Sequence, residues 1–170
     1  LSFAIVTPSY NQGRFISETI ESILDQNYLY FEYFIQDGNS DDNTLEVIKT
    51  YEKQLTGWES KIDNGQSQAI NLGFSKINGE IMCWINSDDI LLPNTLQTVS
   101  NYFYQNPDVD VVYGNRLQID SNSNEIGRWI LPGHDENVLS FADYIPQETL
   151  FWRRSIWEKV GNQVDENLNF

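Results

Sequence analysis

The feature that most constrains the fold is a set of four short apolar runs, three of them nearly continuous. The runs are Phe3–Thr7, Tyr33–Gln36, Ile81–Ile85 and Val109–Gly114. Strands of a parallel sheet are covered on both faces, so they carry continuous apolar runs, whereas strands with one wet face alternate. We therefore interpret these runs as strands of a mostly parallel sheet.

The segments between the runs carry apolar residues at helical spacing. The four stripes are Ile16, Ile20, Ile23 and Leu24; Leu45, Ile48 and Tyr51; Ile70, Phe74 and Ile77; and Leu92, Leu96, Val99 and Phe103. Strands alternating with helices, with one short extra strand before the third helix, predict an open, doubly wound α/β sheet. We find no repeat or linker, so residues 1–170 are expected to form a single domain.

After Asn115 the sequence no longer alternates between continuous apolar runs and helical stripes. Residues 116–131 alternate weakly around the polar turn DSNSNE, which predicts a β-hairpin added to the sheet. The stretch PGHDENVLSFADYIP is typical of a loop with a short helix. ETLFWRRSIWEKVG predicts a strand that enters a helix ending at Gly161.

Charge and composition exclude several partners. The chain has 25 acidic and 10 basic side chains, a net charge of −15, which argues against nucleic acid or an anionic membrane surface as a direct partner. No apolar run is long enough to insert into a membrane, and no signal-peptide pattern opens the chain. The only cysteine, Cys83, lies in an apolar run, which indicates a reducing, cytoplasmic location, at most peripheral to the inner face of a membrane. The strand-like start at Leu1 and the single methionine, Met82, indicate a segment of a longer protein.

Polar residues gather where each predicted strand ends. The four groups are Thr7–Asn11, Asp37–Ser40, Asn86–Asp89 and Asn115–Arg116. Turn formation alone favours these residue types. In open α/β sheets, however, ligands bind at the carboxyl ends of the strands, and carboxylates on successive loops favour a binding site there.

Asp88 and Asp89 are adjacent carboxylates directly after an apolar run. Holding two like charges beside a low-dielectric wall is costly unless a cation or ligand hydroxyls interact with them. Oxygen ligands suit Mg²⁺ or Mn²⁺, which substrate phosphates usually help to coordinate. The alternative is that one of the two caps the helix that follows. The lone His134, and the absence of dinucleotide, P-loop and G-x-S-x-G motifs, disfavour other common sites.

Four segments together resemble the N-terminal part of a family 2 glycosyltransferase of the GT-A, Rossmann-like fold. They are IVTPSYNQGRFISETIESILDQ, IQDGNSDDNTLEVI, DNGQSQAINLGFSKINGEIMCWINSDDILLP and IPQETLFWRRSIWEKVGNQVDENLNF. Each is moderately specific, but four in order along the whole chain form a strong signal.

The resemblance implies roles for individual residues. Thr7, Pro8 and Tyr10 would border the nucleobase, and Asp37 would contact the base or ribose. Gly38 stands where many relatives have a second acid, so which acid holds the base stays open. Further implied roles are Asp63 in the other wall of the nucleotide pocket, Asp88 at the ribose or sugar, and Asp89 as the metal ligand.

On the acceptor side the resemblance implies Gln147, Glu148, Trp152 and Arg153. Arg153 and its neighbour Arg154 have an alternative interpretation as surface or ion-pair residues. The catalytic base of the family usually follows the segment resembling DENLNF, so we expect it beyond Phe170, with Glu148 as a weak substitute. Asp165 and Glu166 are expected to be solvated.

The reaction implied is inverting, metal-dependent transfer of a sugar from a nucleoside diphosphate donor, with UDP as the first choice. The acceptor would be a hydroxyl of a glycan or a lipid-linked molecule. Two alternatives stay open: a nucleotide-sugar-binding module without catalysis, and a sugar-1-phosphate nucleotidyltransferase. The second is disfavoured because the loop after the first strand, TPSYNQGR, offers only Arg14 to a triphosphate.

Overall fold

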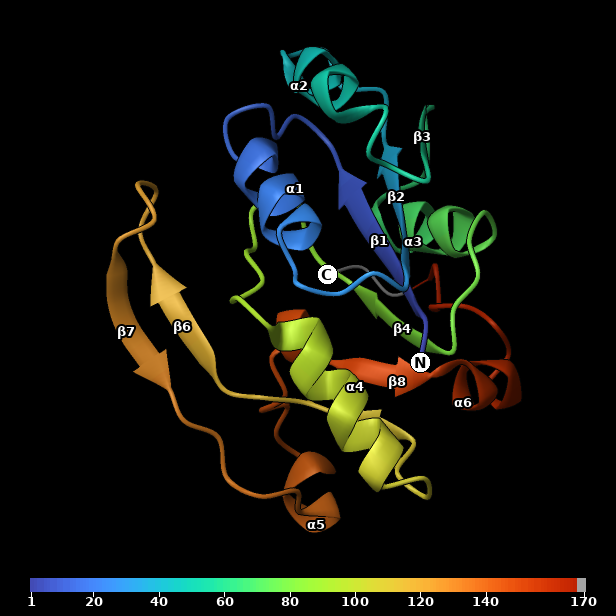
Figure 1. Ribbon diagram of the computed structural model, residues 1–170, viewed down its shortest axis with the longest axis vertical. Helices are drawn as coiled ribbons and strands as arrows, with labels where there is room; N and C mark the ends of the chain where they lie inside the picture. Colours follow the sequence, from blue (N-terminus) through green and yellow to red (C-terminus); the bar gives the residue numbers. More distant parts are fainter. Residues whose placement is uncertain (168–170) are drawn as a thin grey trace.

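The structure is a computed structural model that describes residues 1–167 and contains a six-stranded sheet in the order β3-β2-β1-β4-β8-β5 (Figure 1). The strands of this sheet are β1 (Phe3–Ser9), β2 (Phe31–Asp37), β3 (Gly57–Ser60), β4 (Ile81–Trp84), β5 (Val111–Val112) and β8 (Phe151–Arg153). The helices are α1 (Ile16–Leu24), α2 (Thr44–Tyr51), α3 (Gln66–Phe74), α4 (Thr95–Gln105), α5 (Glu136–Leu139) and α6 (Arg154–Lys159), with a 3-10 turn at Gln147–Thr149. None of the helices in the described residues is long and apolar enough to span a membrane.

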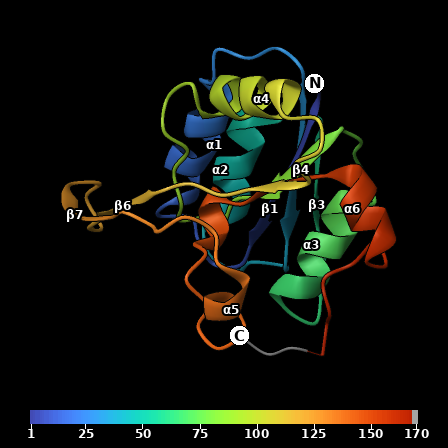
Figure 2. The same cartoon turned by 90° about the horizontal axis from the view of Figure 1, so that it is seen from below.

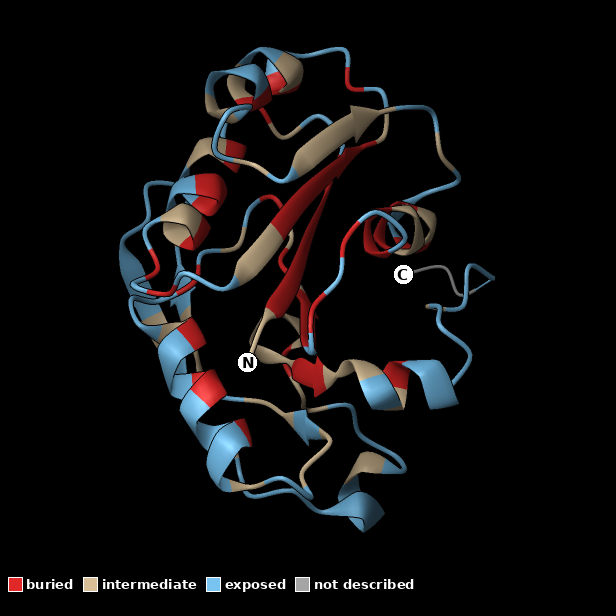
Figure 3. Ribbon diagram, turned by 45° about the vertical axis from the view of Figure 1, so that its right-hand side comes forward, coloured by how far each residue is buried: buried red, intermediate tan, exposed pale blue. Residues whose placement is uncertain are grey.

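The predicted α/β architecture is confirmed. Strands β1 to β4 are parallel, with β1 at the centre, paired to β2 on one side and β4 on the other. All seven residues of β1 are buried, as its continuous apolar run predicts (Figure 3).

The prediction for Val109–Gly114 is wrong in part. Only Val111–Val112 forms a strand, and it pairs antiparallel with β8, not parallel with a neighbour in the sheet. β8 lies between β4 and β5 and runs antiparallel to both. Val111 is exposed, because this strand is at the sheet edge. A pairing between residues about forty positions apart leaves no local signal in the sequence.

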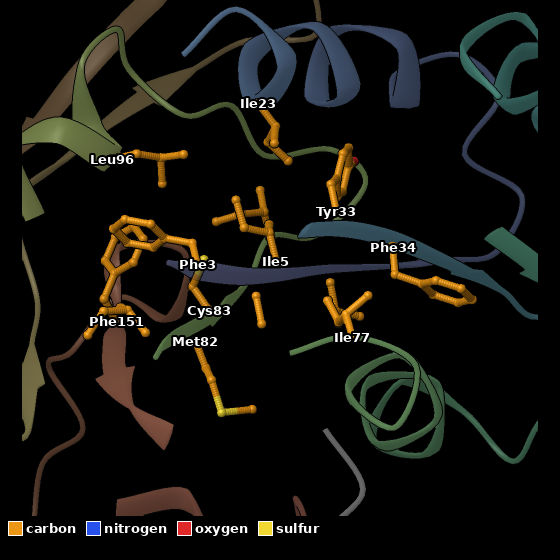
Figure 4. Packing of buried hydrophobic residues seen from close by; sticks show 14 of the residues in the cluster. Phe3, Ile5, Ile23, Tyr33, Phe34, Ile77, Met82, Cys83, Leu96 and Phe151 are labelled. Atoms are coloured by element: carbon orange, nitrogen blue, oxygen red, sulfur yellow. The ribbon is translucent and has the colours of Figure 1, made fainter. Parts of the chain in front are cut away.

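Helices cover both faces of the sheet. Figure 2 shows α1, α2 and α4 on one face and α3 and α6 on the other. The core lies in both layers: Ile23, Tyr33 and Leu96 pack above the strands, whereas Phe34 and Ile77 pack below them (Figure 4). Cys83, free and buried, is part of this core. The sheet is therefore doubly wound.

The predicted hairpin is confirmed as a separate two-stranded sheet, β6 (Arg116–Ile119) and β7 (Glu125–Trp129). It projects from the body of the protein beyond α1 and α4 (Figures 1 and 2). Its turn reaches α1 and the loop before it. Arg14, in that loop, donates a hydrogen bond to the carbonyl of Ser121 at 3.3 Å, and Ser123 bonds Glu18 on α1. Arg116 at the start of β6 pairs with Glu148, so the hairpin is held at both its base and its tip.

Candidate active site at the carboxyl edge of the sheet

A cavity of about 690 Å³ opens where the loops after β1, β2 and β4 meet the start of α3. Parallel strands bring their carboxyl ends to one edge, so three loops far apart in sequence become the walls of one cavity. The lining includes Pro8, Ser9, Tyr10, Gln12, Gly38, Asn39, Asp63, Gln66, Asn86 and Asp88. The predicted nucleotide residues Pro8, Tyr10, Asp63 and Asp88 are therefore brought together.

Tyr10 and Asp63 flank the open backbone of Gly38. A Cβ atom at position 38 would lie 3.3 Å from Asp63 Oδ2 and 3.4 Å from Tyr10 Cδ2. A side chain there would fill the space between the two residues, so glycine keeps this part of the cavity open. Tyr10 is 62% exposed, so its aromatic side chain offers a surface against which a planar base can stack.

Thr7 and Asp37 lie beneath the cavity and not on its wall, because both are fully buried. The Thr7 hydroxyl pairs with Tyr33 at 3.0 Å. The Asp37 carboxylate accepts hydrogen bonds from Ser40 N at 2.9 Å, Ser40 Oγ at 2.5 Å and Ser60 Oγ at 2.6 Å. Direct contact of either residue with a nucleotide stays a prediction and would require the loop to rearrange.

The helix-capping alternative for Asp88 and Asp89 is wrong. α4 begins at Thr95 and its N-cap is Asn94, which leaves five residues between Asp89 and the helix start. The apolar stretch that follows the carboxylates forms a loop, so Leu92, which we expected in the helical pattern, precedes the helix. The two carboxylates must be explained by something other than the helix.

Asp89 lies in an environment that disfavours the charged form of its carboxyl group. Burial, reinforced by the charges of Glu148 and Asp88, raises its pKa to about 6, while a hydrogen bond from Asn86 and the charge of Arg116 act in the opposite direction. Asn86 Nδ2 donates to Asp89 Oδ2 at 3.0 Å and to Gln147 Oε1 at 3.1 Å. The Asn86 amide therefore orients the carboxylate, while the neighbouring acids destabilise its charged form.

Gln66 and Gln147 extend this polar network. Gln66 Nε2 donates to Asn86 Oδ1 at 2.6 Å, and Gln147 Nε2 donates to the carbonyl of Trp84 at 2.7 Å. Asn86 thus uses both ends of its amide, which fixes the side chain that orients Asp89. Gln66 has little local signal in the sequence beyond its place at the start of α3, two residues after Asn64, and its role depends on the fold.

Glu148 lies beside Asp89 and forms an ion pair with Arg116 at 3.1 Å. The guanidinium group of Arg116 also stacks over the Trp129 ring, with its central carbon 4.1 Å from the ring centroid. The hairpin therefore supplies one cation to a cluster of three carboxylates. The position of Arg116 at a predicted strand end carries no signal for this pairing, because Glu148 is distant in the sequence.

A divalent cation fits the donor chemistry at Asp89. Within residues 1–167, no group of three or more His, Cys, Asp or Glu side chains is arranged to hold a metal by itself. Asp89 would then be a protein ligand of an ion whose remaining ligands are phosphate and water oxygens, as is usual for Mg²⁺. A cation would also offset the repulsion that raises the pKa of this carboxyl group.

Trp152 and Arg153 lie away from this cavity. Trp152 is buried in an aromatic cluster with Phe74, Trp84 and Trp157, at ring-centroid distances of 5.4 to 5.9 Å. Arg153 donates to the carbonyls of Val109 at 2.8 Å and Phe103 at 2.9 Å. An acceptor-side role for these two residues stays a prediction, and the structure gives both a packing role.

Of the two alternatives for Arg153 and Arg154, the ion-pair interpretation is wrong, and both residues are partly exposed. Both side chains are half-buried and bind backbone carbonyls; Arg154 Nε donates to Gly79 O at 2.8 Å. In the described residues, neither forms a salt bridge. Their guanidinium groups satisfy carbonyls at the ends of neighbouring elements, which a sequence pattern does not reveal.

Asn71 on α3 clamps the segment near the end of the described chain. Its side chain accepts from Val164 N at 2.8 Å and donates to Val164 O at 2.9 Å and to Glu166 at 2.9 Å. Glu166 also accepts from Gln68 at 3.1 Å, so it is bound at the surface and not simply solvated. Residues 168–170, the last three of the DENLNF segment, lie outside the described residues.

Comparison with known proteins identifies the family. The model of the family described as glycosyl transferase family 2 matches residues 4–165. The chain belongs to glycosyltransferase family 2. A glycosyltransferase of Nostoc sp. is 29% identical over 94% of this chain and 53% of its own length. WfgD of Escherichia coli, named UDP-Glc:alpha-D-GlcNAc-diphosphoundecaprenol beta-1,3-glucosyltransferase, is 28% identical over 76% of this chain and 51% of its own.

Solved structures support the same fold. TarS of Staphylococcus aureus in complex with UDP-GlcNAc has a TM-score of 0.77 at 18% identity, covering 97% of this chain and 49% of TarS 1-349. Mannosyltransferase PcManGT of Pyrobaculum calidifontis, in complex with GDP-Man and Mn²⁺, has a TM-score of 0.75 at 18% identity, covering 98% and 48% of the two chains. The predicted GT-A fold is thus confirmed, and the chain spans about half the length of the curated relatives it matches.

Proposed function

We propose that this chain is the donor-binding part of an inverting, metal-dependent glycosyltransferase that uses a nucleoside diphosphate sugar, with UDP as the nucleotide. The observation that carries the proposal is Asp89, an oriented, half-buried carboxylate beside a nucleotide-sized cavity, with its pKa raised to about 6 by burial and by two neighbouring acids. Such a group is expected where a cation binds. The acceptor is a hydroxyl of a glycan or a lipid-linked molecule.

Different residues of the cavity bind different parts of the donor. Tyr10 offers a ring face to the nucleobase, and Asp63, across Gly38, offers a carboxylate to its polar edge. Asp88 lines the same cavity nearer the centre of the sheet, where its oxygens can accept hydrogen bonds from ribose or sugar hydroxyls. This order runs from the base at β2 to the diphosphate at β4.

Asp89, with the side chains of Asn86 and Gln66 that orient it, lies where the leaving group would bind. Asp89 would hold a Mg²⁺ or Mn²⁺ ion, which when bound would supply positive charge to the leaving diphosphate. Asn86, held by Gln66, keeps the Asp89 carboxylate turned toward one position. Pre-oriented groups cost no reorganisation when charge develops, so the network favours transfer.

The chemical step forms a bond from the acceptor oxygen to the anomeric carbon. The bond from that carbon to the phosphate oxygen breaks, and its electron pair leaves with the nucleoside diphosphate. The hydroxyl proton passes to a carboxylate base. We do not assign that role to Glu148, because its carboxylate is paired with Arg116 at 3.1 Å.

Relatives and neighbours support the donor class. The name of WfgD specifies a UDP-sugar donor, and the solved neighbours bind UDP-GlcNAc or GDP-Man, the latter with Mn²⁺. A nucleotidyltransferase is disfavoured further, because Arg14 binds a hairpin carbonyl and does not line the cavity.

The proposal is tested by thermal shift with UDP and Mn²⁺. We expect UDP with Mn²⁺ to raise the melting temperature, and UDP with a chelator to raise it much less. Asp89→Ala should remove most of the metal-dependent part, whereas Asp41→Ala, an exposed acid in a neighbouring loop, should leave it unchanged. An equal metal-dependent shift in Asp89→Ala and wild type would rule out the metal assignment.

A further inference from the structure

The loop after β1, which carries Tyr10, is bound along its length to the segment between β2 and α2. Three consecutive backbone N–H groups of this loop donate to three different side chains of that segment. The bonds are Asn11 N to Ser40 Oγ at 2.8 Å, Gln12 N to Thr44 Oγ1 at 2.9 Å and Gly13 N to Asp42 Oδ2 at 3.0 Å. A fourth bond runs the other way, from Asp41 N to Asn11 Oδ1 at 3.0 Å. We call these four bonds the loop clamp.

Asp42 and Thr44 support each other at the centre of the loop clamp. Asp42 Oδ1 accepts a hydrogen bond from Thr44 N at 2.9 Å and another from the Thr44 hydroxyl. The same hydroxyl oxygen accepts from Gln12 N, so it joins Asp42 to the first loop. The bonds from the Thr44 hydroxyl, Thr44 N and Gly13 N lower the pKa of Asp42. The carboxylate is therefore held charged, as an acceptor for both loops.

Two residues of the first loop allow this close contact. A Cβ atom at Gly13 would lie 2.1 Å from Asn43 Oδ1 and 2.8 Å from Thr44 N, so a side chain there would push the loops apart. Asn11 has a φ of 54°, in the left-handed region that is uncommon for residues other than glycine. The clamp binds Asn11 through both its backbone N and its side chain. The chain after Tyr10 thus has a conformation that the clamp helps to maintain.

The clamped loops form part of the wall of the cavity that we propose binds the donor. Tyr10 and Gln12 line it from the first loop, and Gly38 and Asn39 line it from the second. Within the described residues 1–167, none of the three clamping side chains lines this cavity. They can therefore affect a bound nucleotide only through the loops that they hold.

A fixed wall favours binding. Ordering the backbone of a residue costs conformational entropy, and a loop that already has its bound conformation does not incur this cost when the ligand arrives. If the clamp is broken, only a fraction of the molecules present Tyr10 and Gln12 correctly, and the apparent affinity falls by that fraction. The loss concerns the nucleoside, which these loops would contact, and not the metal-bound diphosphate at Asp89.

We propose that Asp42 and Thr44 are positioning residues for the donor, which set the affinity for its nucleoside part without contacting it. This inference rests on the proposed function, because it treats the cavity as a nucleotide site. It divides the affinity for the donor into two parts. The clamp sets the nucleoside part, and Asp89 sets the metal-dependent part.

Thr44→Val and Thr44→Ser form a matched pair of variants. Valine has the shape of threonine but cannot bond Gln12 N or Asp42, whereas serine keeps the hydroxyl and loses a buried methyl group. In calorimetric titrations with UMP and a chelator, Thr44→Val should bind at least about 10-fold more weakly than wild type, and Thr44→Ser should stay within about 3-fold. Both changes reduce stability, so a purely structural role would not separate them. Equal UMP affinities of the two variants would overturn the proposal.

Asp42→Ala tests the other half of the clamp, with Asp41→Ala as its control. Asp42→Ala removes the acceptor of Gly13 N and of Thr44, and it should weaken UMP binding about as much as Thr44→Val does. Asp41 takes part in the clamp only through its backbone N, so Asp41→Ala should bind UMP like wild type. Circular dichroism identifies a temperature at which both variants are folded. If they bind UMP equally there, Asp42 is not a positioning residue.

The metal dependence separates this inference from the proposed function. The ratio of UDP affinities with Mn²⁺ and with a chelator should be the same in Thr44→Val as in wild type, because Asp89 is on a different loop. A ratio that falls in Thr44→Val would contradict the division of the affinity. If wild type binds neither UMP nor UDP, the proposed function fails and this inference fails with it. If wild type and Thr44→Val bind UDP with Mn²⁺ equally, only the positioning role fails.

Discussion

Asp37 provides the sharpest test of how the loops of the nucleotide cavity are held. It is fully buried, and its carboxylate accepts three hydrogen bonds, two from Ser40 and one from Ser60. Ser40 Oγ also accepts a hydrogen bond from Asn11 N at 2.8 Å. Asp37 therefore connects the loop after β2 to the loop after β1 that carries Tyr10.

We expect Asp37→Ala to destabilise the protein by about 3 kcal/mol. Alanine leaves three donors without their acceptor, and a buried unsatisfied donor costs about 1 to 3 kcal/mol. The two serine hydroxyls can rotate toward other acceptors or water, but the Ser40 amide is fixed by the backbone, so the lower part of the summed range applies. For a chain of this size, that free-energy loss lowers the melting temperature by about 6 to 12 °C.

The assay is urea unfolding of wild type and variants followed by circular dichroism. Asp41→Ala is the control, because Asp41 is exposed in the same loop, and its stability should stay within about 0.5 kcal/mol of wild type. Adding Ser60→Ala to Asp37→Ala should cost less than Ser60→Ala does alone, because the hydroxyl it removes no longer has its acceptor.

The result also separates a supporting role from a ligand role. If Asp37 only contacted nucleotide, Asp37→Ala would weaken UDP binding and leave the unfolding free energy of the free protein unchanged. A loss below about 1 kcal/mol in urea would refute the supporting role, since even one fixed buried donor left without its acceptor costs that much.

Two further predictions address electrostatics and packing. Because the pKa of Asp89 is raised in the folded protein to about 6, its carboxylate destabilises the fold as the pH rises from about 4 to about 6, and this loss persists above that range. With a chelator present, Asp89→Asn should therefore raise the unfolding free energy at pH 7.5 by about 1 to 3 kcal/mol and change little at pH 4; a variant no more stable than wild type at pH 7.5 would contradict this. Gly73→Ala should destabilise by about 1 to 3 kcal/mol in urea despite the better helix propensity of alanine, because its Cβ would lie 2.5 Å from Val6 Cγ1. Val6→Ala should relieve that clash, and a stabilising Gly73→Ala would show that α3 can shift away from β1.

Much of the fold could be predicted because its signals are local. Continuous apolar runs mark the strands that are buried on both faces, and β1 is buried at every position. The hairpin and the short helix after it follow from turn residues within a few positions of one another. The pairing of β8 between β4 and β5 could not be predicted, because a three-residue strand carries no information about which distant edge it joins.

The candidate site also has features that could be predicted from the sequence and features that depend on tertiary contacts. Topology and residue type were enough to predict that polar loops meet at the carboxyl edge of a parallel sheet, and that Asp88 and Asp89 follow a buried strand there. Three features could be seen only in the folded protein: Asp37 lies beneath the cavity, Glu148 and Arg116 lie beside Asp89, and a mostly apolar cavity lies between Asp89 and α4. The reason is physical: burial and charge pairing depend on which distant segments pack together, and those contacts exist only once the chain is folded.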